Sequence, residues 1–233
     1  MLALGIETAT WMGSIALVDD REGVLGELNI KSASSHSERL IPSIDRLFKE
    51  TKKSLEECEV ICASIGPGSF TGLRIGLATA KGLAFAADKP IAGISTLEIL
   101  ARGIPFVRFP ICPIIDARKK EVFTCIYKWH DSDIKNLEPE MAIKPDSLIK
   151  MITKPTIFVG NGLFPYGDII RNKLKSKALF VSEANNFPRA SILAETGIKR
   201  LTQKMVSRPE DLVPVYIRPS EAELNRKKVE RNK

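Results

Sequence analysis

The chain has 233 residues, of which 44% are hydrophobic and 27% are charged, and these values suit a globular protein of one large or two small domains. The same composition excludes a fibrous or a disordered chain. The apolar start at residues 1–6 is short and no basic stretch precedes it. We therefore expect a cytoplasmic protein, with neither a signal peptide nor contact with a membrane.

The formal net charge of +7 is concentrated at one end of the chain. Residues 224–233 hold five basic residues and one acidic residue, a net charge of +4, which leaves +3 for the other residues. Because this terminus has no aromatic residues, we interpret residues 219–233 as a basic, disordered tail with only weak attraction to phosphate. The four cysteines show no CxxC spacing, so we expect reduced thiols in the core.

The first half of the chain predicts three strands, followed by helices that alternate with strands. The predicted strands are residues 2–8, 14–18, 24–30, 60–65 and 91–94, and the predicted helices are 38–50, 73–87 and 96–102. Proline deep inside a helix clashes with the carbonyl four residues earlier. We therefore expect the first regular helix to begin near Glu38 or Arg39, with Pro42 in its first turn.

The second half repeats the order βββαβαβα of the first. Its predicted strands are residues 111–115, 121–128, 141–144, 156–159 and 179–181, and its predicted helices are 146–152, 166–174 and 190–204. Two copies of a meander with crossover helices are typical of the actin and sugar-kinase superfamily, the ASKHA or ribonuclease H-like fold. We expect an α/β protein with mixed sheets, an N-terminal lobe at residues 1–105 and a C-terminal lobe at residues 106–218.

In that superfamily the turn between the first two strands holds nucleotide phosphate, and an acidic residue ends the first strand. Here Glu7 ends that strand, and Thr8 and Thr10 follow it. Hydroxylic residues are also common in hairpins, so the turn by itself gives weak support for nucleotide binding. Glu7 stands where Asp is usual, and its longer side chain would place a metal-bound water differently. This difference argues against metal-assisted phosphate chemistry.

The most specific stretch is GPGSFTGLRIGLATAKGLA at residues 66–84, between a predicted strand and a predicted helix. Its glycines allow backbone amides at the helix N-terminus to face a ligand or another backbone. Gly66, Gly68, Ser69 and Thr71 therefore join the candidates for a place beside a nucleotide. The glycine spacing matches neither a Walker A loop nor the dinucleotide motif GxGxxG, and Ser69 lacks the GxSxG frame.

Small residues recur at every fourth position of the helix that follows, at Gly72, Gly76, Ala80 and Ala84. Such a row lets another element approach closely, and that element is either the protein's own sheet or first helix, or a partner protein. Glycine inside a helix costs about 0.5–1 kcal/mol, so we favour the partner interface. On this hypothesis, a large residue at Gly76 or Ala80 breaks the pairing without unfolding the monomer.

Residues for catalysis are scarce. His36 and His130 are the only histidines, so there is no HxxxH or HExxH pair, and we expect no metal site, no catalytic residue and no cofactor of the chain's own. Residues 115–121 are bulky, charged and glycine-free, which predicts an exposed hairpin and not a phosphate clamp. Residues 159–162 are interpreted as a strand-to-loop turn, with a contact to adenosine as the less favoured interpretation.

Several stretches together resemble the TsaB (YeaZ) family: LALGIETAT, SSHSERLIPSID, the glycine-rich run, PIIDARKKEVF and PVYIRP, spread over residues 2–218. The resemblance implies an actin-like fold and a non-catalytic partner, or scaffold, of TsaD, the subunit that transfers threonylcarbamoyl to adenosine 37 of tRNA in t6A biosynthesis. It also implies a heterodimer with TsaD, a homodimer when alone, a ternary complex with the ATPase TsaE, ATP or ADP at the complex interface, and indirect contact with tRNA.

The resemblance places the partner interface on the predicted helices at residues 38–50 and 73–87. The candidate interface residues are His36, Arg39, Leu40, Ile44, Leu47, Leu73, Arg74, Gly76, Leu77, Ala80, Lys81 and Ala84.

The alternative is a self-contained enzyme of the same fold, either a small-molecule kinase or a glycoprotease. A kinase requires phosphate loops in both lobes, and the first turn supplies only one weak loop. A peptidase requires metal ligands or a serine and histidine pair, and two histidines offer little for either.

Overall fold

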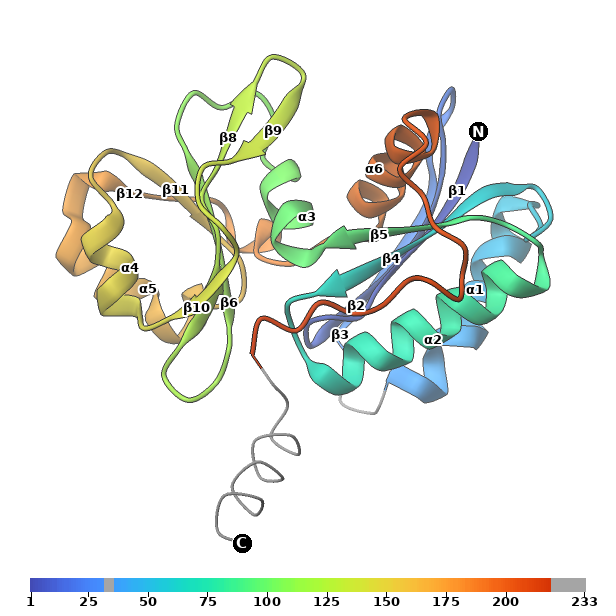
Figure 1. Cartoon of the computed structure of the whole chain (residues 1–233), viewed down its shortest axis with the longest axis horizontal. Coiled ribbons are helices and arrows are strands. Elements are labelled where there is room, and N and C mark those ends of the chain that lie inside the picture. The colour runs from blue at the N-terminus through green and yellow to red at the C-terminus, as the bar shows by residue number, and fades with distance from the viewer. Residues whose placement is uncertain (32–35, 219–233) are drawn as a thin grey trace, which may run out of the picture.

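The chain folds as an α/β protein with two mixed β-sheets, which form two lobes side by side (Figure 1). This computed structural model describes residues 1–31 and 36–218, apart from the side chains of residues 36 and 37. The tail predicted at residues 219–233 lies outside the described residues. In the described part of the chain, every helix is too short or too polar to cross a membrane.

The first lobe is built on a five-stranded sheet. Its strands are β1 (Leu2–Glu7), β2 (Met12–Asp19), β3 (Gly23–Lys31), β4 (Cys58–Gly66) and β5 (Ile91–Ser95), in the order β3-β2-β1-β4-β5. Strands β1, β2 and β3 are antiparallel neighbours, whereas β4 and β5 run parallel to β1. Helices α1 (His36–Thr51) and α2 (Phe70–Ala86) cover one face, where Leu4, Leu17 and Leu77 share a core.

The second lobe repeats this order with shorter strands. They are β6 (Ile111–Asp116), β7 (Val122–Thr124), β10 (Met141–Ile143), β11 (Thr156–Val159) and β12 (Ala178–Phe180), in the order β10-β7-β6-β11-β12. Helices α4 (Pro145–Met151) and α5 (Leu163–Leu174) cover one face around Phe158. The duplication expected from the order of predicted elements is therefore confirmed.

A hairpin of β8 (Tyr127–His130) and β9 (Asp133–Asn136) extends the second lobe. The single strand predicted at residues 121–128 is wrong, because the chain leaves the β7 pairing after Thr124 and begins the hairpin at Tyr127. The Cys125 thiol contacts the Glu138 carbonyl oxygen at 3.0 Å, across the two ends of this detour. The short, polar β9 carries no alternation of apolar residues that predicts a strand.

The last helix of the second repeat packs on the sheet of the first. Helix α6 (Ala190–Thr202) follows β12 in the sequence, but it covers the second face of the first sheet, along β1, β2 and β4. Its small side chains at Ala190 and Ala194 meet Ala3 and Ala16 there. The C-terminal lobe predicted at residues 106–218 is therefore corrected, because α6 belongs to the core of the first lobe.

The last helix of the first repeat makes the opposite exchange. Helix α3 (Thr96–Arg102) follows β5, and its Leu97 and Leu100 are fully or almost fully buried in the core of the second lobe, with Ile111 and Ile115 of β6. Each sheet is thus covered on one face by its own repeat and on the other face by the other repeat. Figure 1 shows α3 beside the second sheet and α6 over the first.

Helix α1 begins at His36, two residues or more before the predicted start, so Pro42 lies in its second turn and not in its first. Proline removes a helical hydrogen bond at any interior position. Pro42 is exposed, so water can solvate the carbonyl that lost its donor.

We expect Gly5→Ala to destabilise the protein, because the added Cβ would overlap the Ala190 carbonyl oxygen and push α6 off β1. Urea unfolding should show that the free energy of unfolding falls by about 2 kcal/mol or more. The matched control is Gly82→Ala on the open side of α2, where a Cβ meets nothing within 4 Å. That variant should gain about 0.5–1 kcal/mol. Equal stability of the two variants would contradict the tight packing of α6 on β1.

Candidate functional site

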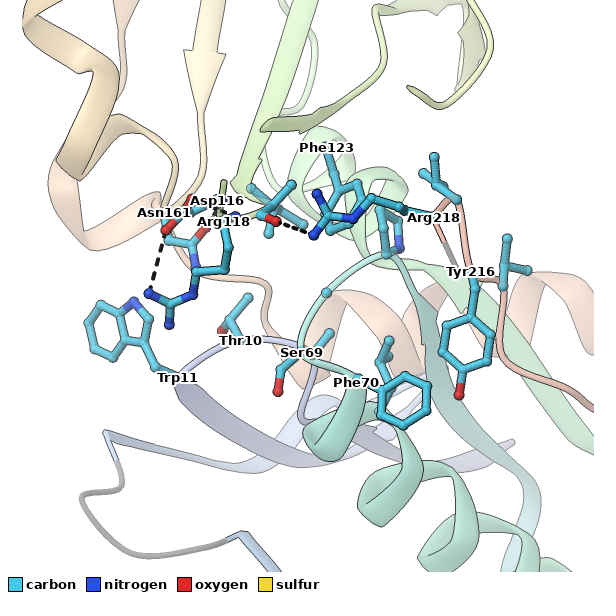
Figure 2. Close-up of a pocket in the computed structure, with 18 of the residues that line it drawn as sticks. Thr10, Trp11, Ser69, Phe70, Asp116, Arg118, Phe123, Asn161, Tyr216 and Arg218 are labelled. Carbon is cyan, nitrogen blue, oxygen red and sulfur yellow. Dashed lines mark hydrogen bonds and ion pairs between the residues drawn. The ribbon is translucent and has the colours of Figure 1, made fainter. Parts of the chain in front are cut away.

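A cleft of about 950 Å³ opens between the two lobes. The first lobe supplies Thr10, Trp11, Ser69 and Phe70, the second lobe supplies Asp116, Arg118, Phe123 and Asn161, and the C-terminal segment supplies Tyr216 and Arg218 (Figure 2). Its walls mix aromatic rings, hydroxyls and guanidinium groups. Such a cleft between lobes is a common location of a ligand site.

The floor of the cleft is formed by two turns of the first lobe that pack backbone against backbone. A Cβ on Gly68 would overlap the Ala9 carbonyl oxygen, and a Cβ on Gly72 would overlap the Thr8 carbonyl oxygen. The Thr8 hydroxyl donates to the Gly72 carbonyl at 2.8 Å. The glycines of the run 66–84 therefore let the β4–α2 turn approach the β1–β2 turn.

The amides of these turns are used inside the protein. Ser69 N donates to Ala9 O at 2.7 Å and Leu73 N donates to Ser69 O at 2.9 Å. Gly72 N donates to the Ser69 hydroxyl at 3.2 Å, and Ala9 N donates to the Glu7 carboxylate at 2.5 Å. A phosphate cradle needs amides that point at the ligand, whereas these four amides are already satisfied.

The candidates for a place beside a nucleotide divide into two groups. Thr10, Gly68 and Ser69 line the cleft, and for them the nucleotide hypothesis stays a prediction. The other four do not line it: they are Glu7, Thr8, Gly66 and Thr71. For these four a place beside a nucleotide also stays a prediction, although Glu7 and Thr8 are buried in the chain.

Glu7 is completely buried on the α6 side of β1. Burial raises the pKa of its carboxyl to about 7, and the hydrogen bond from Ala9 N opposes that rise. The Ser64 hydroxyl lies close enough to favour the charged form slightly. Even so, Glu7 Oε2 and Ser64 Oγ make no hydrogen bond of normal geometry within the described residues. A carboxylate without access to solvent cannot position a metal-bound water in the cleft.

The second lobe presents a charged hairpin to the cleft at residues 116–121. Arg118, Lys119 and Lys120 are consecutive residues with φ between 52° and 63°, in the left-handed region. The turn is closed by hydrogen bonds between Ala117 N and Glu121 O and between Glu121 N and Arg118 O, both at 3.0 Å. The hairpin predicted there is confirmed, and the Arg118 side chain is 87% exposed.

Residues 159–162 form the strand-to-loop turn that the sequence favours. A Cβ on Gly160, at φ 116°, would overlap the Ile114 carbonyl oxygen, and Gly162 N donates to the same oxygen at 3.0 Å. Asn161 Oδ1 accepts a hydrogen bond from Asp116 N at 3.1 Å. The turn is therefore held by the protein's own backbone at the edge of the cleft.

An aromatic cluster spans the mouth of the cleft, and sequence reasoning missed it. The Trp11 ring meets Phe187 edge-on, with centroids 4.5 Å apart, and lies 6.0 Å from Phe164. The Lys31 ammonium lies over the Trp11 ring at 4.8 Å. These residues come from distant segments, so no local spacing could have indicated the cluster.

The row of small residues in α2 faces the protein's own sheet. A Cβ on Gly76 would overlap the Thr8 hydroxyl, so even one added carbon disturbs the core. The candidate interface residues that are buried in the core of the first lobe are Leu40, Ile44, Leu47, Leu73, Gly76, Leu77, Ala80 and Ala84. Their burial leaves little of them for direct contact with a partner, which stays a prediction, and a large residue at Gly76 should unfold the chain.

The remaining candidate interface residues have different positions. Arg39 and Arg74 are exposed on α1 and α2. Lys81 is half-buried, and its ammonium donates to the carbonyls of Glu210 and Leu212 at 3.3 and 3.1 Å. The His36 side chain lies outside the described residues.

The outward face of α2 carries an apolar surface that the sequence analysis did not single out. Ala78, Gly82 and Phe85 follow one another at helical spacing, and all three are exposed. Phe85 is 79% exposed, and Ile41 of the neighbouring α1 is 51% exposed. We call these four residues the α2 face. Its signal in the sequence was a second pair of small residues, Ala78 and Gly82, each two positions away from members of the buried row.

The residues that could carry out metal or thiol chemistry do not gather in the cleft. Across residues 1–31 and 36–218, no cluster of three or more His, Cys, Asp or Glu side chains has an arrangement that could hold a metal. All four cysteines are buried as free thiols, and burial raises the pKa of each, for Cys125 to about 11.

Known proteins resemble this chain over nearly its whole length. Residues 16–226 match the family model described as TsaD, tRNA N6-adenosine threonylcarbamoyltransferase. The tRNA threonylcarbamoyladenosine biosynthesis protein TsaB of Bacillus subtilis is 30% identical over 96% of both chains. The TsaB protein of Escherichia coli is 28% identical over 94% of this chain and 95% of its own.

The fold is shared with YeaZ from Pseudomonas aeruginosa, at a TM-score of 0.78 and 24% identity, over 92% of this chain and 99% of that one. The sequence relatives cover both lobes, the glycine-rich run and the C-terminal segment. The chain belongs to the TsaB (YeaZ) family of proteins for the biosynthesis of threonylcarbamoyladenosine in tRNA.

Proposed function

We propose that this chain is a non-catalytic, cytoplasmic partner of a TsaD-type threonylcarbamoyltransferase in t6A biosynthesis, and that it docks through the α2 face. The single observation that carries the proposal is the open position at Gly82, beside the exposed ring of Phe85. Glycine inside a helix costs about 1 kcal/mol relative to alanine. No contact within the described chain accounts for it, so we infer that a partner approaches there.

The shape of the α2 face suits a packed helix. Ala78 and Gly82 leave this side of α2 without long side chains, Phe85 follows as an exposed apolar anchor, and Ile41 is exposed on the neighbouring α1. Small residues let two helices approach closely, and aromatic anchors dominate the energy of many interfaces. Arg39 and Arg74 lie on the exposed sides of the same two helices and can provide a polar rim.

The partner is assigned from the family. A surface of this kind suits either TsaD or a second copy of this chain, and we assign TsaD as the functional partner and the homodimer as the state of the free chain. In this proposal TsaE joins as a third subunit, ATP or ADP binds at the complex interface, and tRNA is contacted through TsaD.

The non-catalytic role is supported by the cleft. Three amides of its glycine-rich turn and one amide of its β1–β2 turn donate to groups of the protein itself, and its strand-end carboxylate is buried. The competing function, a small-molecule kinase of the same fold, rests on the volume of the cleft and on the exposed Arg118. A glycoprotease has no structural feature in its favour.

Ala78→Trp should weaken binding to the cognate TsaD about tenfold or more, because the indole would block the close approach of a partner to the α2 face. The matched control is Asn172→Trp, which adds the same side chain to an exposed position of α5 in the other lobe. Isothermal titration calorimetry gives both affinities, and circular dichroism checks both folds. If the two variants bind TsaD equally well, the docking site lies elsewhere.

Glu7→Gln should remove a pH-dependent loss of stability. The pKa of the Glu7 carboxyl is raised in the folded chain, so the protonated carboxyl contributes its full stabilisation of the fold below about pH 4.5. That contribution is lost as the pH rises towards 7, by roughly 3 kcal/mol in total. The stability of Glu7→Gln minus that of the natural chain should therefore rise by about this amount between pH 4.5 and pH 8, in urea unfolding at each pH.

The same variant tests the non-catalytic role. Glu7→Gln should support tRNA modification in a mixture with TsaD, TsaE and threonylcarbamoyl-adenylate as well as the natural chain does. The natural chain alone should show negligible ATPase and peptidase turnover. Turnover by the chain alone that disappears in folded Glu7→Gln protein would favour the enzyme alternative.

A further inference from the structure

The C-terminal segment at residues 212–218, here called the strap, is anchored first in the first lobe. Before it, Ser207 and Ile91 exchange two backbone hydrogen bonds of 2.9 and 3.0 Å. Leu212 then packs into the core under α2, and Val215 N donates to Ile65 O at 2.8 Å, at the end of β4. The strap is therefore fixed along the same lobe as the α2 face.

The strap is also bound to α2 itself. Tyr216 packs against Phe70 in the first turn of α2, with ring centroids 5.1 Å apart. Arg74 lies over the Phe70 ring at 4.0 Å and donates from Nε to the Tyr216 hydroxyl at 3.2 Å. The start of α2 thus holds the strap by a ring contact and a hydrogen bond, and the Arg74 guanidinium packs on the same Phe70 ring.

The strap ends on the second lobe. Ile217 packs against the core that α3 shares with β6. Arg218 donates from Nη1 to the Glu121 carboxylate and from Nη2 to the Ala117 carbonyl, both at 2.9 Å. Both partners lie in the charged hairpin on the far wall of the cleft. Figure 2 shows Tyr216 on the α2 side and Arg218 reaching the hairpin side.

The chain joins the lobes at two other places, where β5 passes into α3 at residues 95–96 and where β12 leads to α6 through residues 181–189, and both lead to an exchanged helix. The strap is a third link, and it lines the cleft with four consecutive residues, from Val215 to Arg218. A third link across the opening restricts rotation of one lobe against the other more than two links do.

We propose that the strap couples the α2 face to the cleft, so that docking on α2 and the angle between the lobes depend on each other. This inference rests on the proposed docking through α2. The first turn of α2 holds Tyr216, and two residues later Arg218 holds the hairpin. A partner that holds Arg74 against Tyr216 therefore also favours the contact of Arg218 with the hairpin, and loss of the Arg218 contact weakens docking.

The first part of the test measures the lobes in the full chain without a partner. Spin labels are attached to two introduced cysteines, Glu22→Cys in the first lobe and Lys154→Cys in the second. Double electron–electron resonance then measures the distance between the lobes. Both positions are exposed, whereas the four natural thiols are buried and react slowly. Arg218→Ala and Glu121→Ala remove one ion pair from opposite sides, and both should broaden the distance distribution. Lys173→Ala, which breaks an exposed ion pair inside the second lobe, should not.

The second part measures affinity for the cognate TsaD. Glu121 lies in the second lobe, so Glu121→Ala should weaken binding about fivefold or more only if the strap transmits the change. Lys173→Ala should bind like the natural chain. An unchanged distance distribution in both Arg218→Ala and Glu121→Ala would contradict the claim that the strap restrains the lobes. A broadened distribution with unchanged affinity would contradict the claim that the lobe angle and docking on α2 are coupled. Full affinity of Ala78→Trp would instead overturn the docking site, while the distances still decide whether the strap holds the lobes.

Discussion

The exchange of α3 and α6 between the two repeats is the constraint on which the other features depend. A sheet of mixed strands must be covered on both faces, and here each repeat supplies only one of the two layers for its own sheet. Ala190 and Leu193 bury one face of β1 and β4, and Leu97 and Leu100 bury one face of β6. Neither lobe has a complete core of its own, so the angle between the lobes follows from the packing of two helices.

The close approach of α6 to β1 also decides what the first turn can do. Gly5 lets the Ala190 carbonyl lie against β1, and the next side chain on that face is Glu7. A carboxylate in this position is covered by the helix and loses contact with the cleft. The β4–α2 turn then packs on the β1–β2 turn from the other side and uses the amides that a phosphate would require. Close packing on the two sides of β1 therefore leaves neither this carboxylate nor these amides available to a phosphate.

Local chemistry in the sequence predicted most of the helices and strands and the duplication. The glycine-rich run, for example, marked the turn between β4 and α2, although α2 begins at Phe70, with Ser69 as its cap, and not at the predicted residue 73. The exchange of the last helices could not be predicted, since a helix that follows β12 carries no local sign of the sheet it covers. The same holds for Trp11 and Phe187, which meet only in the folded chain.

The partner interface was harder to predict for a related reason. A small-residue row shows that something approaches the helix closely, but not whether that neighbour is the protein's own backbone. Thr8 fills the space beside Gly76, whereas the space beside Gly82 is open. The folded structure is needed to tell a glycine that packs on the protein's own chain from one that faces open space. The row with the most glycines therefore belongs to the core, and the exposed small residues on the other side of α2 are the ones left open.

The exchange of helices also has a consequence for the order of events during synthesis. Strands β1 to β5 leave the ribosome first, but their second face stays uncovered until the residues of α6, up to Thr202, have emerged. The N-terminal portion therefore cannot complete its fold as an independent unit ahead of the rest, as many N-terminal domains do. The contacts of α6 with β1, β2 and β4 join residues that are far apart in the sequence, which should make the final step of folding slow. Truncated or stalled chains should expose an apolar face of the first sheet to chaperones and proteases.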